Sequence, residues 1–100
     1  MKELISYSDK ENINKPYLIF YTYDGIILSK KIEDYLNKFE CQEKNINFYV
    51  CKNIDICVNM GYTKLPLVEM VTNDKIRIND ELSNITEQDL EKWINENIGE

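Results

Sequence analysis

Three cysteines are the residues of this 100-residue sequence that could carry nucleophilic or redox chemistry: Cys41, Cys51 and Cys57. A thiol attacks as its thiolate, and disulfide exchange needs a second thiol to resolve the mixed disulfide. No pair has the spacing of a CxxC motif, and Cys51 and Cys57, six positions apart, fit no standard zinc site. Three reduced thiols are therefore expected, with a Cys51–Cys57 disulfide or a single reactive thiol as the alternative.

The sequence contains no histidine. Its absence removes serine and cysteine triads that use a histidine base, zinc sites that contain histidine, and any histidine pH switch. The only cation beside a candidate thiol is Lys52. The sequence therefore predicts no metal, no cofactor and no activated nucleophile.

The net charge of −6 is concentrated at one end of the chain. Residues 1–79 contain 11 acidic and 11 basic side chains, whereas residues 80–100 contain seven acidic ones and only Lys92 as a base. An acidic segment repels phosphate backbones, so we expect no nucleic-acid partner. The segment is interpreted as a solvated helix face, with a contact surface for a basic partner as the alternative.

Length and composition indicate a single domain over residues 1–100. Hydrophobic residues make up 43% and charged residues 30%, which is typical of a globular chain. Apolar runs are only a few residues long, so no membrane span is expected. The charged start, Met1-Lys2-Glu3-Leu4, has no long apolar stretch behind it, which predicts no signal peptide and a cytoplasmic location.

The first half of the chain predicts two strands and two helices. A short strand is expected within residues 1–5, and Ser8-Asp9-Lys10-Glu11 has the form of a capping box for a helix that ends near Asn14. The uninterrupted apolar and aromatic run Tyr17–Tyr23 predicts a strand buried on both faces, at the centre of a sheet. A helix follows from Ile26 onward. Its buried face is expected to consist of Leu28, Ile32, Tyr35, Leu36 and Phe39.

The second half completes an alternating pattern. Strands are predicted over Ile46–Cys51 and Leu67–Val71, and Lys75–Ile78 alternates like an edge strand. Between the first two lies a short helix, Ile54–Met60, with Gly61 as its C-cap. The last helix is capped by Thr86, with Asp89 at the third helical position; its buried stripe is Leu90, Trp93, Ile94 and Ile98. The sequence thus predicts an α/β fold with a central mixed β-sheet flanked by helices, in the order β(α)βαβαββα.

This order and three segments resemble the thioredoxin family over nearly the whole chain. Lys15-Pro16 before the strand Tyr17–Tyr21 is similar to the family's strand leading to its active site, and Met60–Pro66 is similar to its aromatic-Gly-Val-x-x-Ile-Pro segment. Ile85–Leu90 is similar to the start of its last helix. The resemblance implies a thioredoxin-like fold and a cis peptide bond before Pro66, in the loop Lys64-Leu65-Pro66.

The family's chemistry depends on a motif that this sequence lacks. Where thioredoxins have Trp-Cys-Gly-Pro-Cys, this chain has Tyr23-Asp24-Gly25-Ile26-Ile27. Asp24 could cap the following helix, but neither it nor Ile27 can exchange disulfides. The family also keeps a buried carboxylate in the preceding strand, and the matching position here is Leu18. Two separate parts of the redox machinery are therefore absent.

The resemblance also implies where a partner would bind. In the family the loop at the cis-proline lies beside the active site, and its backbone pairs with an extended substrate segment. The surrounding residues are expected to form an apolar surface for a protein partner or a homodimer: Tyr23, Ile26, Ile27, Tyr62 and Leu65. At least one residue of Ile26-Ile27-Leu28 must be exposed, because three consecutive helical residues cannot all face inward. The alternatives are that loops cover the surface and that the proline turn is only structural.

Two functions follow from these observations. The first is a redox-inactive thioredoxin-like protein, a binding or accessory module that uses the degenerate active-site corner and the cis-proline loop. The second is an atypical thiol-disulfide oxidoreductase that uses Cys51 or Cys57. Cys57 is expected to be a small buried core residue, and Cys51, at the end of its strand, is expected to be partly exposed.

Overall fold

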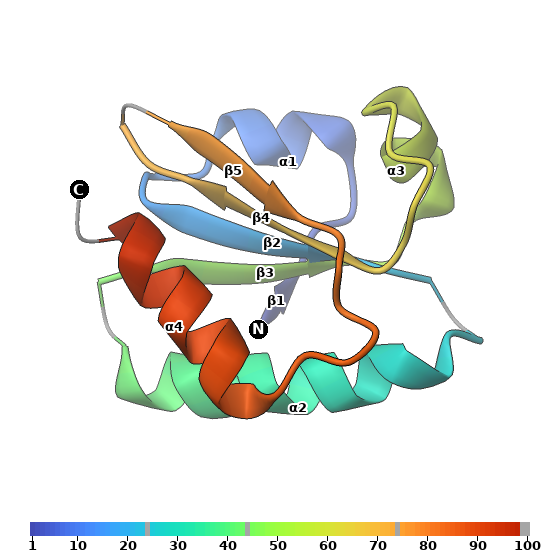
Figure 1. Ribbon diagram of the computed structural model, residues 1–100. Coiled ribbons are helices and arrows are strands. Elements are labelled where there is room, and N and C mark those ends of the chain that lie inside the picture. Colours follow the sequence, from blue (N-terminus) through green and yellow to red (C-terminus); the bar gives the residue numbers. More distant parts are fainter. Residues whose placement is uncertain (24, 44, 74, 99–100) are drawn as a thin grey trace.

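The computed structural model describes residues 1–23, 25–43, 45–73 and 75–98 and contains one mixed five-stranded sheet (Figure 1). The strand order is β1-β3-β2-β4-β5. Strands β1 and β2 both run parallel to β3, β4 runs antiparallel to β2, and β5 runs antiparallel to β4. The strands are β1 (Lys2–Glu3), β2 (Tyr17–Tyr21), β3 (Asn47–Cys51), β4 (Leu67–Val71) and β5 (Ile76–Asn79). The predicted order of elements is confirmed.

Strand β2 occupies the centre of the sheet because it has no polar face to expose. All five of its residues are buried, as the apolar run predicted, although the strand ends at Tyr21 and not at Tyr23. Alternation along the strand sends Leu18 and Phe20 into one core and Ile19 and Tyr21 into the other. The sheet therefore separates two hydrophobic cores.

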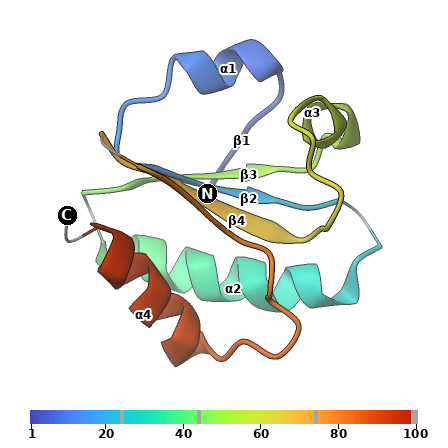
Figure 2. The same ribbon diagram turned by 45° about the horizontal axis from the view of Figure 1, so that its top comes forward.

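Helices α2 (Ile27–Gln42) and α4 (Glu87–Ile98) cover one face, here called the α2/α4 face (Figure 2). Ile32 and Leu36 of α2 are buried in that core with Leu90 and Ile94 of α4. The start of α4 follows the predicted capping box. The Asp89 N–H donates to Thr86 Oγ1 at 3.1 Å, and the Thr86 N–H donates to the Asp89 carboxylate at 3.3 Å.

Helices α1 (Tyr7–Glu11) and α3 (Ile54–Asn59) cover the opposite face, the α1/α3 face (Figure 2). The predicted cap of α1 is wrong: Ser6 is the N-cap, not Ser8, and Asp9 accepts from the Ser6 N–H at 3.0 Å. The helix ends at Glu11. In α3 the C-cap is Met60, and Gly61 follows it with a φ of 78°, a left-handed conformation that favours glycine.

Other boundaries also shift by one residue from the prediction. Strand β3 begins at Asn47, and β5 spans Ile76–Asn79 at the edge of the sheet. Helix α2 begins at Ile27, and α3 ends at Asn59. In the part of the chain that the structure describes, no helix combines the length and apolar character needed to cross a membrane.

Candidate functional site

The candidate site lies at the end of the sheet where β2 leads into α2 and where the loop after α3 enters β4 (Figure 1). Gly25 has a φ of 99°, a conformation in which a side chain would be strained, so a glycine suits this turn. The N-cap residue of α2 is Ile26, whereas Asp24 was expected to cap this helix. Asp24 itself lies outside the described residues. The Leu65–Pro66 peptide bond is cis, and so is Lys15–Pro16.

A groove opens beside the Leu65–Pro66 loop, between that loop, α3 and the segment after β2. We call it the corner groove. Its volume is about 520 Å³. Its lining residues are Tyr23, Ile54, Cys57, Val58, Tyr62, Thr63, Lys64 and Leu65. Among these described residues Lys64 is the only charged one, and its ammonium lies 4.0 Å from the Asp80 carboxylate. The described lining is therefore mainly apolar.

The structure brings together three of the five residues predicted to form the apolar surface. Tyr23, Tyr62 and Leu65 share the corner groove, whereas Ile26 lines a separate, more polar hollow beside Lys52. Ile27 lines neither hollow, and its side chain is 94% exposed at the start of α2. Exposure of one residue in the run Ile26-Ile27-Leu28 is thereby confirmed.

A pair of buried hydroxyl groups joins the end of β2 to α2. The side chains of Thr22 and Ser29 are hydrogen-bonded to each other, and both residues are buried. The Thr22 N–H also donates to the Cys51 carbonyl at 2.9 Å. Leu18, at the position of the family's buried carboxylate, is fully enclosed in the core under α2. The junction thus contains hydroxyl groups but no described thiol.

The two candidate thiols lie in the core on the α1/α3 face. Cys57 is fully buried, as predicted, but Cys51 is also fully buried, so its expected partial exposure is wrong. The cause is the register of β3, which points Cys51 toward the core beneath α3. Burial raises the pKa of Cys51. Burial is also the main cause that raises the pKa of Cys57 to about 11, and the neighbouring Cys51 is the second. All three cysteines are free thiols, and only Cys41 is exposed.

A buried carboxylate that the sequence analysis did not single out lies behind the groove. Glu69, in the middle of β4, is 1% exposed. The Lys10 ammonium lies 2.9 Å from Glu69 Oε1, and the Tyr21 hydroxyl donates to the same oxygen at 3.3 Å. The Tyr62 hydroxyl donates to Oε2. One carboxylate therefore links α1, β2 and the loop after α3 to β4.

The tyrosines around Glu69 remain protonated, because their pKa values are raised. Burial, and then the charge of Glu69, raises the pKa of Tyr17 to about 12 and raises that of Tyr21 still further. Burial and the hydrogen bond to Glu69 raise the pKa of Tyr62. The rings of Tyr21 and Tyr62 pack edge to face, with their centroids 5.0 Å apart. The cluster fixes the orientation of Tyr62, which also lines the corner groove.

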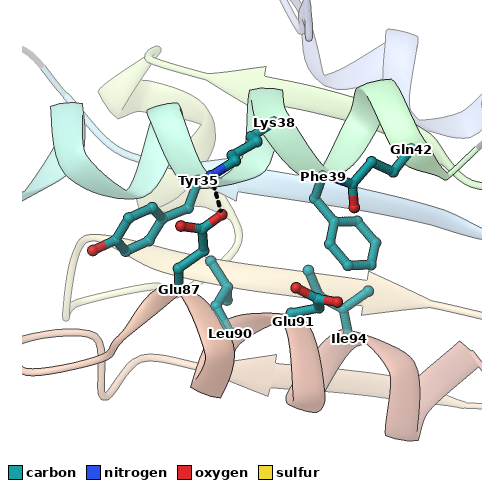
Figure 3. Close-up of a pocket in the computed structure, with 8 residues that line it drawn as sticks. All are labelled: Tyr35, Lys38, Phe39, Gln42, Glu87, Leu90, Glu91 and Ile94. Atoms are coloured by element: carbon teal, nitrogen blue, oxygen red, sulfur yellow. Dashed lines mark ion pairs between the residues drawn. The ribbon is translucent and has the colours of Figure 1, made fainter.

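The crevice between α2 and α4 does not provide a second site. It is lined by residues of both helices and crossed by the Lys38–Glu87 ion pair at 3.0 Å (Figure 3). Its volume is about 10 Å³, which is room for about one water molecule. Among the described residues, no three Asp, Glu or Cys side chains gather closely enough to hold a metal ion.

Sequence reasoning also missed Ile54 and Val58. These residues lie four positions apart on α3 and are 53% and 66% exposed at the groove. Their spacing was a usable signal, because residues at i and i+4 share one face of a helix. Glu69 also left a signal, as the single charged residue in the apolar run Leu67–Val71.

Comparison with known proteins identifies the fold. No protein-family model matches the chain, and no curated protein matches its sequence. Mitochondrial thioredoxin 3 from Saccharomyces cerevisiae, in its oxidised form, superposes with a TM-score of 0.79 at 17% identity, over 96% of this chain and 94% of that chain. Fasciola hepatica thioredoxin superposes with a TM-score of 0.79 at 13% identity, over 96% of this chain and 98% of that one.

A third similar structure concerns the thiol-resolving mechanism of yeast mitochondrial 1-Cys peroxiredoxin via the glutathione and thioredoxin systems. A chain of it superposes with a TM-score of 0.81 at 17% identity, over 96% of this chain and 94% of that one. The chain therefore has the thioredoxin-like fold, and the predicted fold class and resemblance are confirmed.

The Lys10–Glu69 pair is expected to be strongly coupled to folding. Replacing Lys10 with Met leaves a buried carboxylate without its counter-charge, which should lower the free energy of unfolding by roughly 3–5 kcal/mol. The double variant Lys10→Met, Glu69→Leu removes both charges and should be more stable than Lys10→Met alone. Urea unfolding of the wild type, Lys10→Met, Glu69→Leu and the double variant, followed by circular dichroism, measures the coupling energy.

The exposed pair Lys38–Glu87 provides the matched control. Its side chains are 63% and 34% exposed. The same set of single and double variants at this pair should therefore give a coupling energy of at most about 1 kcal/mol. Equal coupling energies for the two pairs would contradict the structural role assigned to Glu69.

The thiols are expected to differ sharply in reactivity. In the folded protein iodoacetamide should modify exposed Cys41 and spare Cys51 and Cys57, because burial limits access and their raised pKa values reduce the thiolate fraction. All three should react once the chain is unfolded in guanidinium chloride. Mass spectrometry of peptides from both samples measures this. Alkylation of Cys51 or Cys57 in the folded state as fast as Cys41 would favour the thiol-enzyme alternative.

Proposed function

We propose that this chain is a redox-inactive thioredoxin-like protein that binds another protein at the corner groove and the Leu65–Pro66 loop. The observation that carries the proposal is the clustering of exposed apolar side chains beside that groove. Tyr23, Ile54 and Val58 are each at least 41% exposed and line it. Exposed Ile27 adds to the same end of the sheet (Figure 1). Contiguous apolar exposure of this kind marks interaction sites.

The chemistry of the degenerate corner supports the absence of redox activity. The positions of the two motif cysteines are occupied by Asp24 and Ile27, so no thiol stands at the start of α2. A helix N-terminus stabilises a thiolate only where a cysteine is present. Cys51 and Cys57 do not replace them readily, because neither has exposed surface and both have raised pKa values, although Cys57 lies at the wall of the corner groove.

The groove suggests the kind of partner. Its aromatic and aliphatic lining would accept apolar side chains from an extended segment. Lys64 at the rim, part of whose charge is offset by Asp80 at 4.0 Å, would weakly favour an acidic group beside them. A second copy of this chain is the alternative occupant. We place this accessory module in the cytoplasm, without a cofactor and without a nucleic-acid partner.

Redox inactivity is tested by reduction of insulin with dithiothreitol. The wild-type chain should precipitate the insulin B chain no faster than dithiothreitol alone, with an active thioredoxin as the positive control. The double variant Cys51→Ser, Cys57→Ser separates the two functions. Acceleration by the wild type that this variant abolishes would establish the thiol-enzyme alternative instead.

Binding at this end of the sheet is tested with Ile27→Asp, which places a charge at the exposed first residue of α2. Affinity capture from the native source should recover the partner with wild type and lose it with Ile27→Asp. The matched control is Ile5→Asp, because Ile5 is also exposed, at 72%, and does not line the corner groove. Undiminished capture by Ile27→Asp would place the interface elsewhere.

A further inference from the structure

Strand β5 forms one edge of the sheet and carries two exposed isoleucines. It is last in the strand order, with β4 as its neighbour. Ile76 is 64% exposed and Ile78 is 47% exposed. Ile76 lies opposite Val71, whose side chain belongs to the α1/α3 core, and Ile78 lies opposite Glu69. Both isoleucines therefore face the α1/α3 side and form one apolar strip along the edge.

The backbone of the same two residues is directed outward. The Thr72 N–H donates to the Lys75 carbonyl at 2.9 Å, so residues 72 and 75 form a hydrogen-bonded pair at the start of the β4–β5 ladder. Such pairs alternate along an antiparallel ladder, and residues 75, 77 and 79 therefore direct their backbone groups toward β4. The N–H and C=O groups of Ile76 and Ile78 point away from the sheet, where another strand can meet them.

We propose that β5 pairs antiparallel with β5 of a second copy of this chain, with Ile78 opposite Ile78 on a two-fold axis. A two-fold axis perpendicular to the sheet keeps each face on its own side, so it pairs residues whose side chains share a face. The axis must therefore lie midway between the two copies of one residue, so that this residue stands opposite itself. The registers that overlap the strand centre are those on Ile76, Arg77 and Ile78.

Charge selects one of these three registers. An axis at Arg77 places Arg77 opposite itself, and an axis at Ile76 places Lys75 opposite Arg77; both juxtapose like charges. An axis at Ile78 instead places Arg77 opposite Asn79. It also places Lys75 opposite Glu81, just beyond the end of the strand, and symmetry produces each of these pairs twice. Only this register is complementary in charge.

The resulting dimer would have one continuous ten-stranded sheet, five strands from each copy. On the α1/α3 side Ile78 would face Ile78 of the second copy and Ile76 would face Asp80, while the charged pairs lie on the other side. A contact between two short strands is small, so we expect weak, concentration-dependent association. The surface is distinct from the corner groove and the inference does not rest on the proposed function.

Sedimentation velocity from about 10 µM to about 1 mM tests the association, because weak interfaces assemble in this range. The wild-type chain should shift from monomer to dimer. Lys75→Glu and Glu81→Lys should each weaken dimerisation by roughly tenfold, because each opposes like charges at two places. The double variant Lys75→Glu, Glu81→Lys restores opposite charges and should dimerise like the wild type. Thermal unfolding of each variant confirms that it is folded.

Engineered cysteines test the register. In a Cys41→Ser background, Ile78→Cys should form a disulfide-linked dimer under mild oxidation, because residues on the axis have Cα atoms about 5.5 Å apart. Ile76→Cys is the matched control and should cross-link far more slowly. A wild-type chain that stays monomeric at about 1 mM would overturn the proposal. So would faster cross-linking of Ile76→Cys, or a dimer that Ile27→Asp dissociates and Lys75→Glu does not.

Discussion

The buried carboxylate of Glu69 is the constraint on which much of the α1/α3 side depends. An ionised group in the centre of a sheet is costly unless its oxygens are paired and hydrogen-bonded. Here the partners come from three different parts of the chain: Lys10 from α1, Tyr21 from β2 and Tyr62 from the loop after α3. None of these segments can move away without leaving a polar group unsatisfied. The short helix α1 is thus held by charge as well as by packing.

The same carboxylate shapes the candidate binding surface from behind. Tyr62 presents its ring to the corner groove while its hydroxyl is held by Glu69, and the ring packs against Tyr21. Lys10 approaches the Tyr21 ring to 5.8 Å from its centroid. A partner in the groove would therefore meet an aromatic wall whose orientation is already fixed. Less conformational entropy is lost when such a wall is contacted than when a mobile side chain must be ordered.

The sequence predicted the elements whose signals are local. The apolar run of β2 and the capping box Thr86/Asp89 each specify their structure from adjacent residues. The start of α1 was misassigned because Ser6 and Ser8 each precede an acid three positions later, so the local pattern allows two caps. The Glu69 cluster was missed for a different reason. Lys10 lies 59 positions before Glu69, and only the folded sheet brings them together.

The candidate site also combines features that local sequence determines with features that depend on the tertiary structure. Helix geometry was enough to predict that one residue of Ile26-Ile27-Leu28 is exposed. That Ile26 and Ile27 do not line the corner groove depends instead on how distant segments pack together. Burial of Cys51 likewise depends on the register of β3 against β2, which the strand sequence alone does not specify.

The acidic segment lies mainly on α4 but also reaches Lys64 at the corner groove. Four acidic side chains of residues 80–100 lie on α4, which packs on the α2/α4 face (Figure 2). The corner groove lies beside α3, and Lys64 is the only charged residue among its described lining. Asp80, at the start of the acidic segment, lies 4.0 Å from Lys64 and offsets part of its charge. Recognition at the groove would therefore depend mainly on local apolar contacts, with the Lys64–Asp80 pair beside them.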